Sequence, residues 1–265
     1  MKYIFLSMLL ISGMSISHTY AQKEDKAETK GQNFSLEGAL DLFKKSKNLE
    51  EFEKFLNQED NNVNNLDLNN DGQTDYIVVQ DIQDQETHVI VLSTYINEKD
   101  KQDIATIGIE KTGKEEAILQ IEGDEDLYAT NTIVEPFEEE QKSNKRGPNI
   151  LDIQLIRVNV WFWPSVQFVY APSYRVWVSP YRWGYYPMWW KPWRPWGHPV
   201  FYTRTAPYRV YYRPAPVRRV VVARRVYAPR RSTTVVIHKP HGKTVIHTNR
   251  RGKTTVVKTR RGRRR

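Results

Sequence analysis

Oxygen-bearing side chains alternate along residues 67–75, a spacing suited to a hard cation. Gly72 stands at the sixth position, where such a loop must turn sharply. Carboxylates this close repel one another unless a cation or water screens them. The loop therefore predicts a structural Ca²⁺ site, and a metal-free turn of Asx residues and glycine is the alternative. The predicted ligands are the side chains of Asp67, Asn69, Asp71 and Asp75 and the backbone carbonyl of Gln73.

The segment from Leu66 to Val79 resembles the D-x-N-x-D-G-x-x-D calcium loops of integrin-type and related repeat proteins, in which the loop leads directly into a strand. It departs from an EF-hand because Thr74 replaces the aliphatic residue at position eight and Val78 replaces the bidentate glutamate at position twelve. The resemblance implies a calcium ion that fixes the start of a sheet. Because only one copy occurs, a propeller of such repeats is not predicted.

A second kind of chemistry comes from arginine in the C-terminal part of the chain. Residues 23–156 carry 14 Lys and Arg against 31 Asp and Glu, whereas residues 157–265 carry 25 Lys and Arg and no acid. Arginine binds phosphate and carboxylate groups bidentately and stacks on aromatic rings. The tail is therefore predicted to bind polyanions. The predicted contacts are the arginine pairs Arg218, Arg219, Arg224, Arg225, Arg230, Arg231, Arg250, Arg251, Arg260 and Arg261.

Aromatic residues form a third group, which joins the acidic and basic parts. Proline recurs at Pro164, Pro172 and Pro180, which favours short extended pieces over a packed sheet. Tryptophan and arginine together suit anionic polymers or a membrane surface. The alternative is that these rings form a satellite core against the acidic domain. The predicted aromatic contacts are all eight tryptophans, Trp161, Trp163, Trp177, Trp183, Trp189, Trp190, Trp193 and Trp196.

The elements that position these residues follow from hydrophobic periodicity. Apolar side chains at a period of 3.6 residues predict two short helices, capped by Ser35 and Asn48. Strand patterns follow at residues 76–80, 87–95, 104–110 and 117–121. The predicted fold class is α+β, with the two N-terminal helices packed on a small antiparallel sheet and a largely extended or disordered aromatic and basic tail.

Composition divides the chain into six parts. They are a signal peptide (1–21), a flexible leader (22–33), an acidic α+β domain (34–137), a linker (138–149), an aromatic and proline-rich segment (150–200) and an arginine-rich tail (201–265). The signal peptide predicts export to the periplasm or the outer cell surface. The absence of cysteine excludes disulfides, thiol catalysis and a lipidated cysteine anchor.

A family resemblance supports this layout. The segments 66–79, 88–92, 120–128 and 133–136 resemble a family of uncharacterised secreted bacterial proteins. In that family a similar acidic domain precedes a tail rich in Trp, Tyr and Pro. The resemblance covers most of residues 60–200 and implies the domain layout and an envelope location, without an activity or site.

These observations favour a non-enzymatic envelope protein that binds anionic surface polymers or a membrane surface through its tail. The export signal argues against intracellular nucleic acid as the partner. One alternative is a structural or self-associating protein in which the acidic domain and basic tail pair. A second is a hydrolase in the acidic domain, which would require a concave acidic pocket there.

Overall fold

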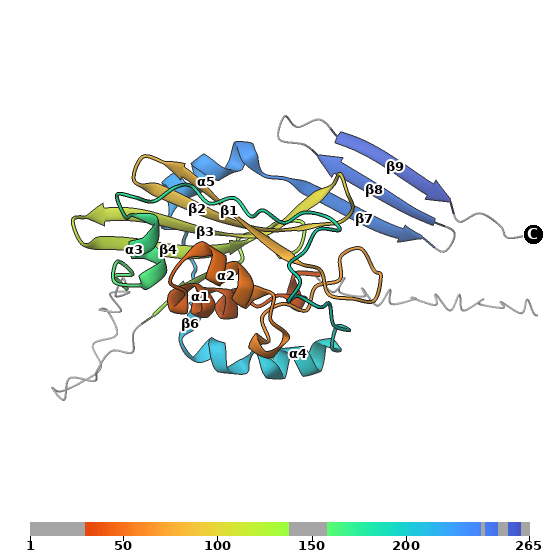
Figure 1. Cartoon of the computed structure of the whole chain (residues 1–265), viewed down its shortest axis with the longest axis horizontal. Helices are drawn as coiled ribbons and strands as arrows, with labels where there is room; N and C mark the ends of the chain where they lie inside the picture. Colours follow the sequence, from red (N-terminus) through yellow and green to blue (C-terminus); the bar gives the residue numbers. More distant parts are fainter. Residues whose placement is uncertain (1–29, 138–157, 240–241, 249–253, 261–265) are drawn as a thin grey trace, which may run out of the picture.

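An antiparallel sheet of six strands is the centre of the molecule (Figure 1). The computed structural model describes residues 30–137, 158–239, 242–248 and 254–260. The sheet runs in the order β1 (Ile77–Asp84), β2 (Thr87–Tyr95), β3 (Lys101–Gly113), β4 (Glu116–Gly123), β5 (Ile133–Pro136) and β6 (Tyr212–Pro214). With the helices described below, this confirms the predicted α+β class.

The first two helices begin at the residues that the sequence indicates as caps. Before α1 (Leu36–Lys45), the Ser35 hydroxyl accepts a hydrogen bond from the Gly38 N–H at 3.0 Å. Before α2 (Leu49–Leu56), the Asn48 side-chain oxygen accepts one from the Glu51 N–H at 2.7 Å. Each cap satisfies an N–H that the first helical turn leaves without a partner. Both helices bury their apolar sides in one hydrophobic cluster that includes Ile77, Val79, Ile90, Leu92 and Ile107 of the sheet.

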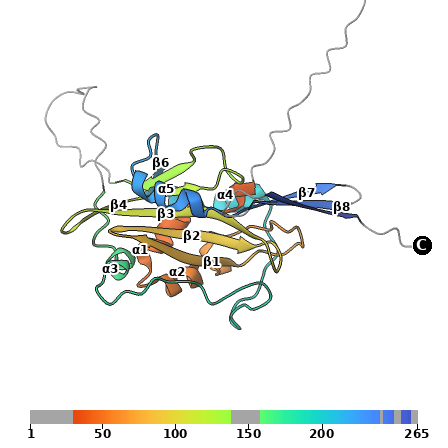
Figure 2. The same cartoon turned by 90° about the horizontal axis from the view of Figure 1, so that it is seen from above.

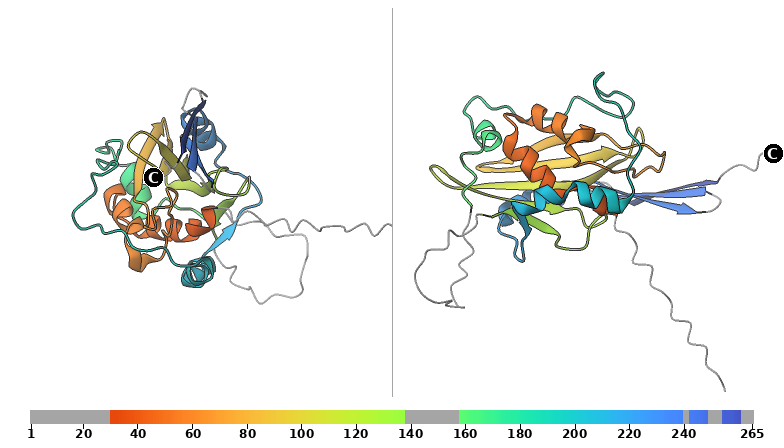
Figure 3. Two further views of the ribbon diagram at one scale, coloured as in Figure 1. Left: turned by 90° about the vertical axis from the view of Figure 1, so that its right-hand side faces the viewer. Right: turned by 90° about the horizontal axis from the view of Figure 1, so that it is seen from below.

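The opposite face of the sheet is covered by the basic tail. Val220, Ala223 and Val226, in and beside α5 (Val221–Tyr227), form a separate cluster with Val89 and Val91 of β2. Because side chains alternate along a strand, this face is distinct from the one that α1 and α2 contact. In Figure 3 (left) the two N-terminal helices and α5 lie on opposite sides of the sheet.

The C-terminal half of the chain also completes both edges of the sheet. β6 pairs antiparallel with β5, placing Val134 opposite Pro214. At the other edge, residues 177–179 run beside β1. There the Asp81 N–H donates to the Trp177 carbonyl at 2.9 Å, and the Ser179 N–H donates to the Val79 carbonyl at 3.0 Å. Open edges are templates for intermolecular pairing. These contacts cover the outer side of β5 and residues 79–81 of β1, and the three-residue strand β6 becomes the new edge.

The rest of the C-terminal half forms short elements and a second sheet. The short elements are α3 (Pro164–Val169) and α4 (His198–Arg204), together with the 3₁₀ turns η3 (Ala206–Val210) and η4 (Ala228–Arg230); η1 (Lys30–Asn33) and η2 (Glu59–Asn61) belong to the N-terminal half. The second sheet has the order β7 (Thr233–Lys239), β8 (Gly242–Thr248) and β9 (Thr254–Arg260), and it extends away from the main body (Figure 2).

The prediction of a largely extended or disordered tail is therefore wrong for the described residues that form α3 to α5 and β6, whereas residues 170–197 contain no helix or strand element. Proline spacing and like charge argue against order in an isolated segment. These two features carry no information about partners elsewhere in the chain, and here the acidic sheet supplies such partners. Residues 177–179 of the predicted segment 150–200 and β6 of the predicted segment 201–265 thus pair with the sheet formed by residues 34–137.

Several predictions fall on other parts of the chain. The signal peptide (1–21), most of the leader (22–33), the linker (138–149) and the arginines Arg250, Arg251 and Arg261 lie outside the described residues. Within the described residues, no helix combines the length and the apolar composition that crossing a bilayer requires.

Close contact between α5 and the sheet depends on Gly108 of β3. A Cβ atom at this position would lie 2.8 Å from the Ala223 Cβ and 2.9 Å from a Val220 methyl carbon. We expect Gly108→Ala to lower the free energy of unfolding by about 1–3 kcal/mol, because α5 must shift to relieve the overlap. Denaturant unfolding measures this change.

Gly197→Ala is the matched control, because nothing lies within 4 Å of the Cβ position at Gly197. An equal effect of the two substitutions, or none at Gly108, would contradict the close approach of α5.

Candidate cation loop and arginine interface

The loop from Asp67 to Asp75 folds around the carboxylate of its first residue. The Asp67 carboxylate accepts hydrogen bonds from the Asp71 N–H at 3.1 Å and from the Gly72 N–H at 2.9 Å. Asn70 and Gly72 have φ values of 58° and 85°, the left-handed region that Asn and Gly tolerate best. The alternating Asx residues and the glycine thus wind the backbone around their own side chains.

Asp75 closes the loop from a buried position. Its carboxylate accepts a hydrogen bond from the Leu68 N–H at 2.6 Å, and 6% of the residue is exposed. Burial raises the pKa of Asp75 to about 8, and the negative charges of Asp67 and Asp71 act in the same direction. The loop therefore holds more negative charge than its surroundings compensate.

Three of the five predicted ligand residues, Asn69, Asp71 and Asp75, contact one another through their side chains. The Asn69 amide nitrogen lies 3.1 Å from an Asp71 oxygen and 3.3 Å from an Asp75 oxygen, and Asp67 is joined to Asp71 through the backbone. Gln73 follows in the same turn, and its N–H donates to the Asp71 carboxylate at 2.9 Å. The donor set consists of oxygen atoms, which suits Ca²⁺. In this conformation the described residues hold no group of three or more His, Cys, Asp or Glu placed to share a metal, so calcium stays a prediction.

The cation loop is fastened to the aromatic segment. The Thr74 N–H donates to the Trp193 carbonyl at 2.8 Å, and the Trp193 N–H donates to the Thr74 hydroxyl at 3.2 Å. Just before the loop, Asn65 forms a second reciprocal pair with the backbone of Trp196, at 2.8 and 2.9 Å. These bonds join segments about 120–130 residues apart in the sequence.

The predicted aromatic contact residues are largely involved in packing within the molecule. Trp163 and Trp193 are buried, and Trp161 and Trp177 are partly buried against the main hydrophobic cluster. The remaining rings lie nearer the surface. Trp189 and Trp190 pack against Tyr76, Arg204 stacks over the Trp196 ring at 4.3 Å, and Trp183 is half-buried. This arrangement corresponds to the satellite core that the sequence left as an alternative.

Carboxylates around β4 and β5 pair with arginines from the tail, and we call this set the arginine interface. It consists of Arg218 with Glu122, Arg219 with Glu135, Arg224 with Glu125, and Arg231 with Asp124 and Asp126. Arg231 binds Asp124 bidentately, with N–O distances of 2.6 and 2.7 Å. Hydrogen bonding to Asp124 raises the pKa of Arg231 above its ordinary value. Glu122, Asp124 and Glu135 are each less than 9% exposed, so these pairs are sheltered from solvent.

The structure thus separates the predicted polyanion-binding arginines into groups. Arg218, Arg219, Arg224 and Arg231 neutralise acids of the same chain. Arg225 and Arg230 are exposed on and just after α5, and Arg230 donates to the Val226 carbonyl at 3.1 Å. Arg260 ends β9. The arginine pairs are therefore not one uniform binding surface.

Two buried carboxylates also hold the tail, and sequence reasoning did not single them out. Asp103 in β3 accepts hydrogen bonds from the Tyr227 hydroxyl at 2.9 Å and the Ser232 N–H at 2.7 Å. Glu53 in α2 accepts one from the Ser179 hydroxyl at 2.7 Å, and burial raises its pKa to about 7. The available signal was an acid at a buried position of an apolar pattern, because such acids need a partner.

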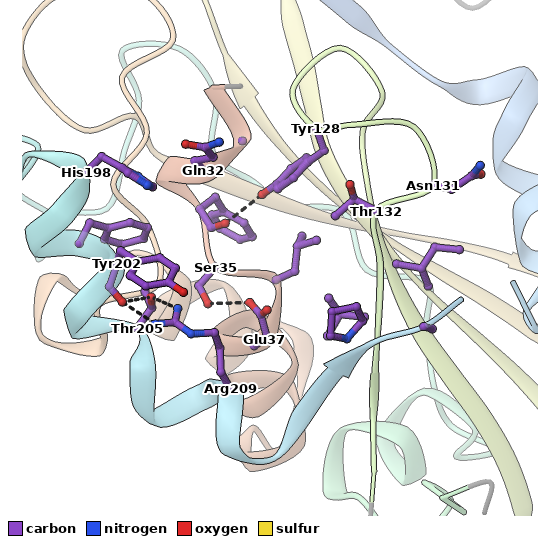
Figure 4. A pocket seen from close by; sticks show the side chains of 18 residues that line it. Gln32, Ser35, Glu37, Tyr128, Asn131, Thr132, His198, Tyr202, Thr205 and Arg209 are labelled. Carbon is purple, nitrogen blue, oxygen red and sulfur yellow. Dashed lines mark hydrogen bonds between the residues drawn. The ribbon is translucent and has the colours of Figure 1, made fainter. Parts of the chain in front are cut away.

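A cavity of about 550 Å³ lies between the N-terminal part and the tail (Figure 4). Glu37 and Arg209 line it, together with Ser35, His198 and Tyr202. The Ser35 hydroxyl is occupied by the Gly38 N–H and by Glu37, and Arg209 bonds the Tyr202 carbonyl at 2.7 Å. Among the described residues, Glu37 is the single carboxylate in the lining. The paired carboxylates of many glycoside hydrolases are thus not assembled in this cavity.

Comparisons with known proteins give no relative for this geometry: no protein-family model, curated protein or solved structure matches the chain. The resemblance to secreted bacterial proteins therefore stays a prediction.

If the loop binds calcium, the stabilisation of the protein by Ca²⁺ should depend on pH. The pKa of Asp75 is about 8 in the folded chain and 3.8 in the reference state. The unfolded chain therefore loses this proton near pH 4 and the folded chain only near pH 8, so the free energy of unfolding falls as pH rises between these values. Ca²⁺ prefers the ionised ligand. We expect Ca²⁺ to raise the melting temperature by several degrees above pH 8 and to have little effect at pH 5. Thermal unfolding with Ca²⁺ or a chelator tests this.

Asp75→Asn should remove both the pH-dependent loss and the response to Ca²⁺, whereas Asp60→Asn, at an exposed acid outside the loop, should retain both. Calorimetric titration provides a second check. Identical heats for the wild type and Asp71→Ala would mean that the loop binds no calcium.

The arginine interface predicts that replacing one arginine by an uncharged residue destabilises the fold. Arg231→Gln leaves the Asp124 carboxylate buried without its bidentate cation. We expect it to lower the free energy of unfolding by about 2 kcal/mol. Arg225→Gln is the control, because Arg225 is exposed on the neighbouring helix α5 and forms no ion pair with the described residues. Chemical denaturation of both variants measures the difference, and equal stability would show that the interface contributes nothing.

Proposed function

We propose that this chain is an exported, non-enzymatic envelope protein whose cationic half has two roles. Its first part completes the fold of the acidic half, and its last part holds anionic polymer at the cell envelope. The two N-terminal helices and the six-stranded sheet serve as the platform for both. The observation that carries this proposal is the internal pairing of Arg218, Arg219, Arg224 and Arg231.

Internal pairing changes which cations are available to a partner. A guanidinium that already binds a buried carboxylate bidentately cannot bind a phosphate or sulfate without leaving that carboxylate unpaired. Residues 233–265, in contrast, contain eleven Lys and Arg and no Asp or Glu. Polymer binding is therefore assigned to β7–β9 and the residues around them.

The kind of polymer follows from the predicted location. The signal peptide and the family resemblance favour the envelope, where phosphorylated lipopolysaccharide and acidic polysaccharides are the abundant polyanions. The eleven cations attract such chains without a specific recognition geometry, so the interaction should weaken strongly with salt. Intracellular nucleic acid is not the proposed partner.

The structural alternative receives support from the same contacts. Pairing between the acidic half and the basic half occurs within one chain, through the arginine interface and through Asp103 with Tyr227. We therefore include this pairing in the proposal as a requirement for folding, with calcium at residues 67–75 as a further structural element.

Retention on immobilised heparin tests which cations bind polymer. We expect the full-length variant Lys243→Gln/Lys258→Gln/Arg260→Gln to elute at clearly lower salt than the wild type. The slope of log affinity against log salt should fall by roughly one for each polymer-binding cation that the substitutions remove.

Arg175→Gln/Arg182→Gln/Arg194→Gln is the matched control, because it removes the same charge from exposed positions of the aromatic segment. If the two triple variants elute together, binding depends on net charge alone, and the assignment to residues 233–265 is wrong.

A further inference from the structure

Three large apolar side chains are exposed together in one turn of the aromatic segment. Tyr185 is 66% exposed, Met188 is 100% exposed and Trp189 is 43% exposed. We call these three residues the apolar tip. The segment between α3 and α4 that contains them runs along the β1 edge and bulges outward from the body (Figures 2 and 3). Grouped apolar exposure of this kind marks an interaction site. The other exposed apolar residues are single or in adjacent pairs, such as Val210 with Tyr211 and Val221 with Val222.

The turn is held in shape from below, so the exposure of the tip is built into the fold. Tyr76, itself buried, contacts the rings of Tyr186 and Trp190 at centroid distances of 5.2 and 5.1 Å. The backbones of Arg182 and Tyr185 bond each other reciprocally, and Gly184 between them has a φ of 73°. A rigid turn loses little conformational entropy when it binds.

Cationic groups surround the tip. The Arg182 guanidinium stacks over the Tyr185 ring at 4.5 Å, and the Lys54 ammonium lies 5.8 Å from the Trp189 ring centroid. Lys191 and Arg194 follow in the sequence and are exposed. Acids of the cation loop also act on this region, because the charges of Asp75 and Asp71 raise the pKa of Tyr186, although burial is the larger cause. The apolar tip is therefore flanked by two cations, Arg182 and Lys54.

We propose that the apolar tip inserts into the headgroup region of an anionic lipid bilayer. An apex without hydrogen-bonding groups, such as Met188, gains nothing from a hydrated polysaccharide but gains free energy from an acyl boundary. Tyrosine and tryptophan favour the membrane interface, and lysine and arginine favour anionic headgroups. The proposal rests on the proposed export of the chain, and it assigns membrane contact and polymer binding to different surfaces.

Sedimentation with lipid vesicles tests this assignment. We expect the full-length protein to bind vesicles of phosphatidylglycerol and phosphatidylethanolamine more strongly than vesicles of phosphatidylcholine. Met188→Asp should weaken binding to the anionic vesicles about tenfold, because it places a charge at the apex in place of an apolar side chain that the bilayer would bury. Since Met188 is fully exposed, the substitution removes no packing from the fold.

Val221→Asp is the control, because Val221 is 50% exposed on α5, which packs on a face of the sheet and not along the β1 edge where the tip lies. It should bind vesicles like the wild type, and Met188→Asp should keep its retention on heparin. Equal vesicle binding by Met188→Asp and the wild type, equal loss in both aspartate variants, or no vesicle binding by the wild type would each overturn the proposal. Vesicle binding by a wild type that heparin does not retain would support the tip and contradict the proposed polymer binding.

Discussion

The burial of Glu122, Asp124 and Glu135 around β4 and β5 is the constraint on which the rest of the structure depends. A buried carboxylate is costly unless a cation or several donors compensate it. The tail supplies these cations from residues 218–231, and their attachment brings α5 onto the bare face of the sheet. The opposite charges of the two halves thus meet in ion pairs inside the fold as well as at its surface.

The aromatic segment is held in a different way. It runs along the β1 edge, and its many prolines lack the N–H group that strand pairing requires. Backbone groups of residues 177–179, Trp193 and Trp196 form hydrogen bonds with the acidic half. Elsewhere the segment is held by packing of its aromatic rings. In the acidic half, Glu53 accepts a hydrogen bond from Ser179 and Thr74 accepts one from the Trp193 N–H. Tryptophan provides large contact areas without requiring regular secondary structure. A proline-rich segment can therefore be ordered when another part of the chain provides its partners.

Local features of the sequence predicted local structure well. The caps at Ser35 and Asn48, the second strand at Thr87–Tyr95 and the turn around Gly72 follow from neighbours a few residues apart. The tail was mispredicted because its partners are distant: Arg218 meets Glu122 across 96 residues, and Tyr227 meets Asp103 across 124. Charge asymmetry indicated that the halves attract each other, but it could not indicate which arginines are used. The apolar tip depends on tertiary exposure, which composition alone does not encode.

Pairing of the C-terminal half with both edges of the sheet has a consequence for the order of events during synthesis. A ribosome completes residues 77–136 long before it reaches β6, so the nascent sheet has open edges and uncompensated acids. Pairings of such long sequence separation form slowly. We therefore expect the acidic half to complete its fold only when the last third of the chain is available, and a chain truncated before residue 212 to aggregate more readily than the full-length chain.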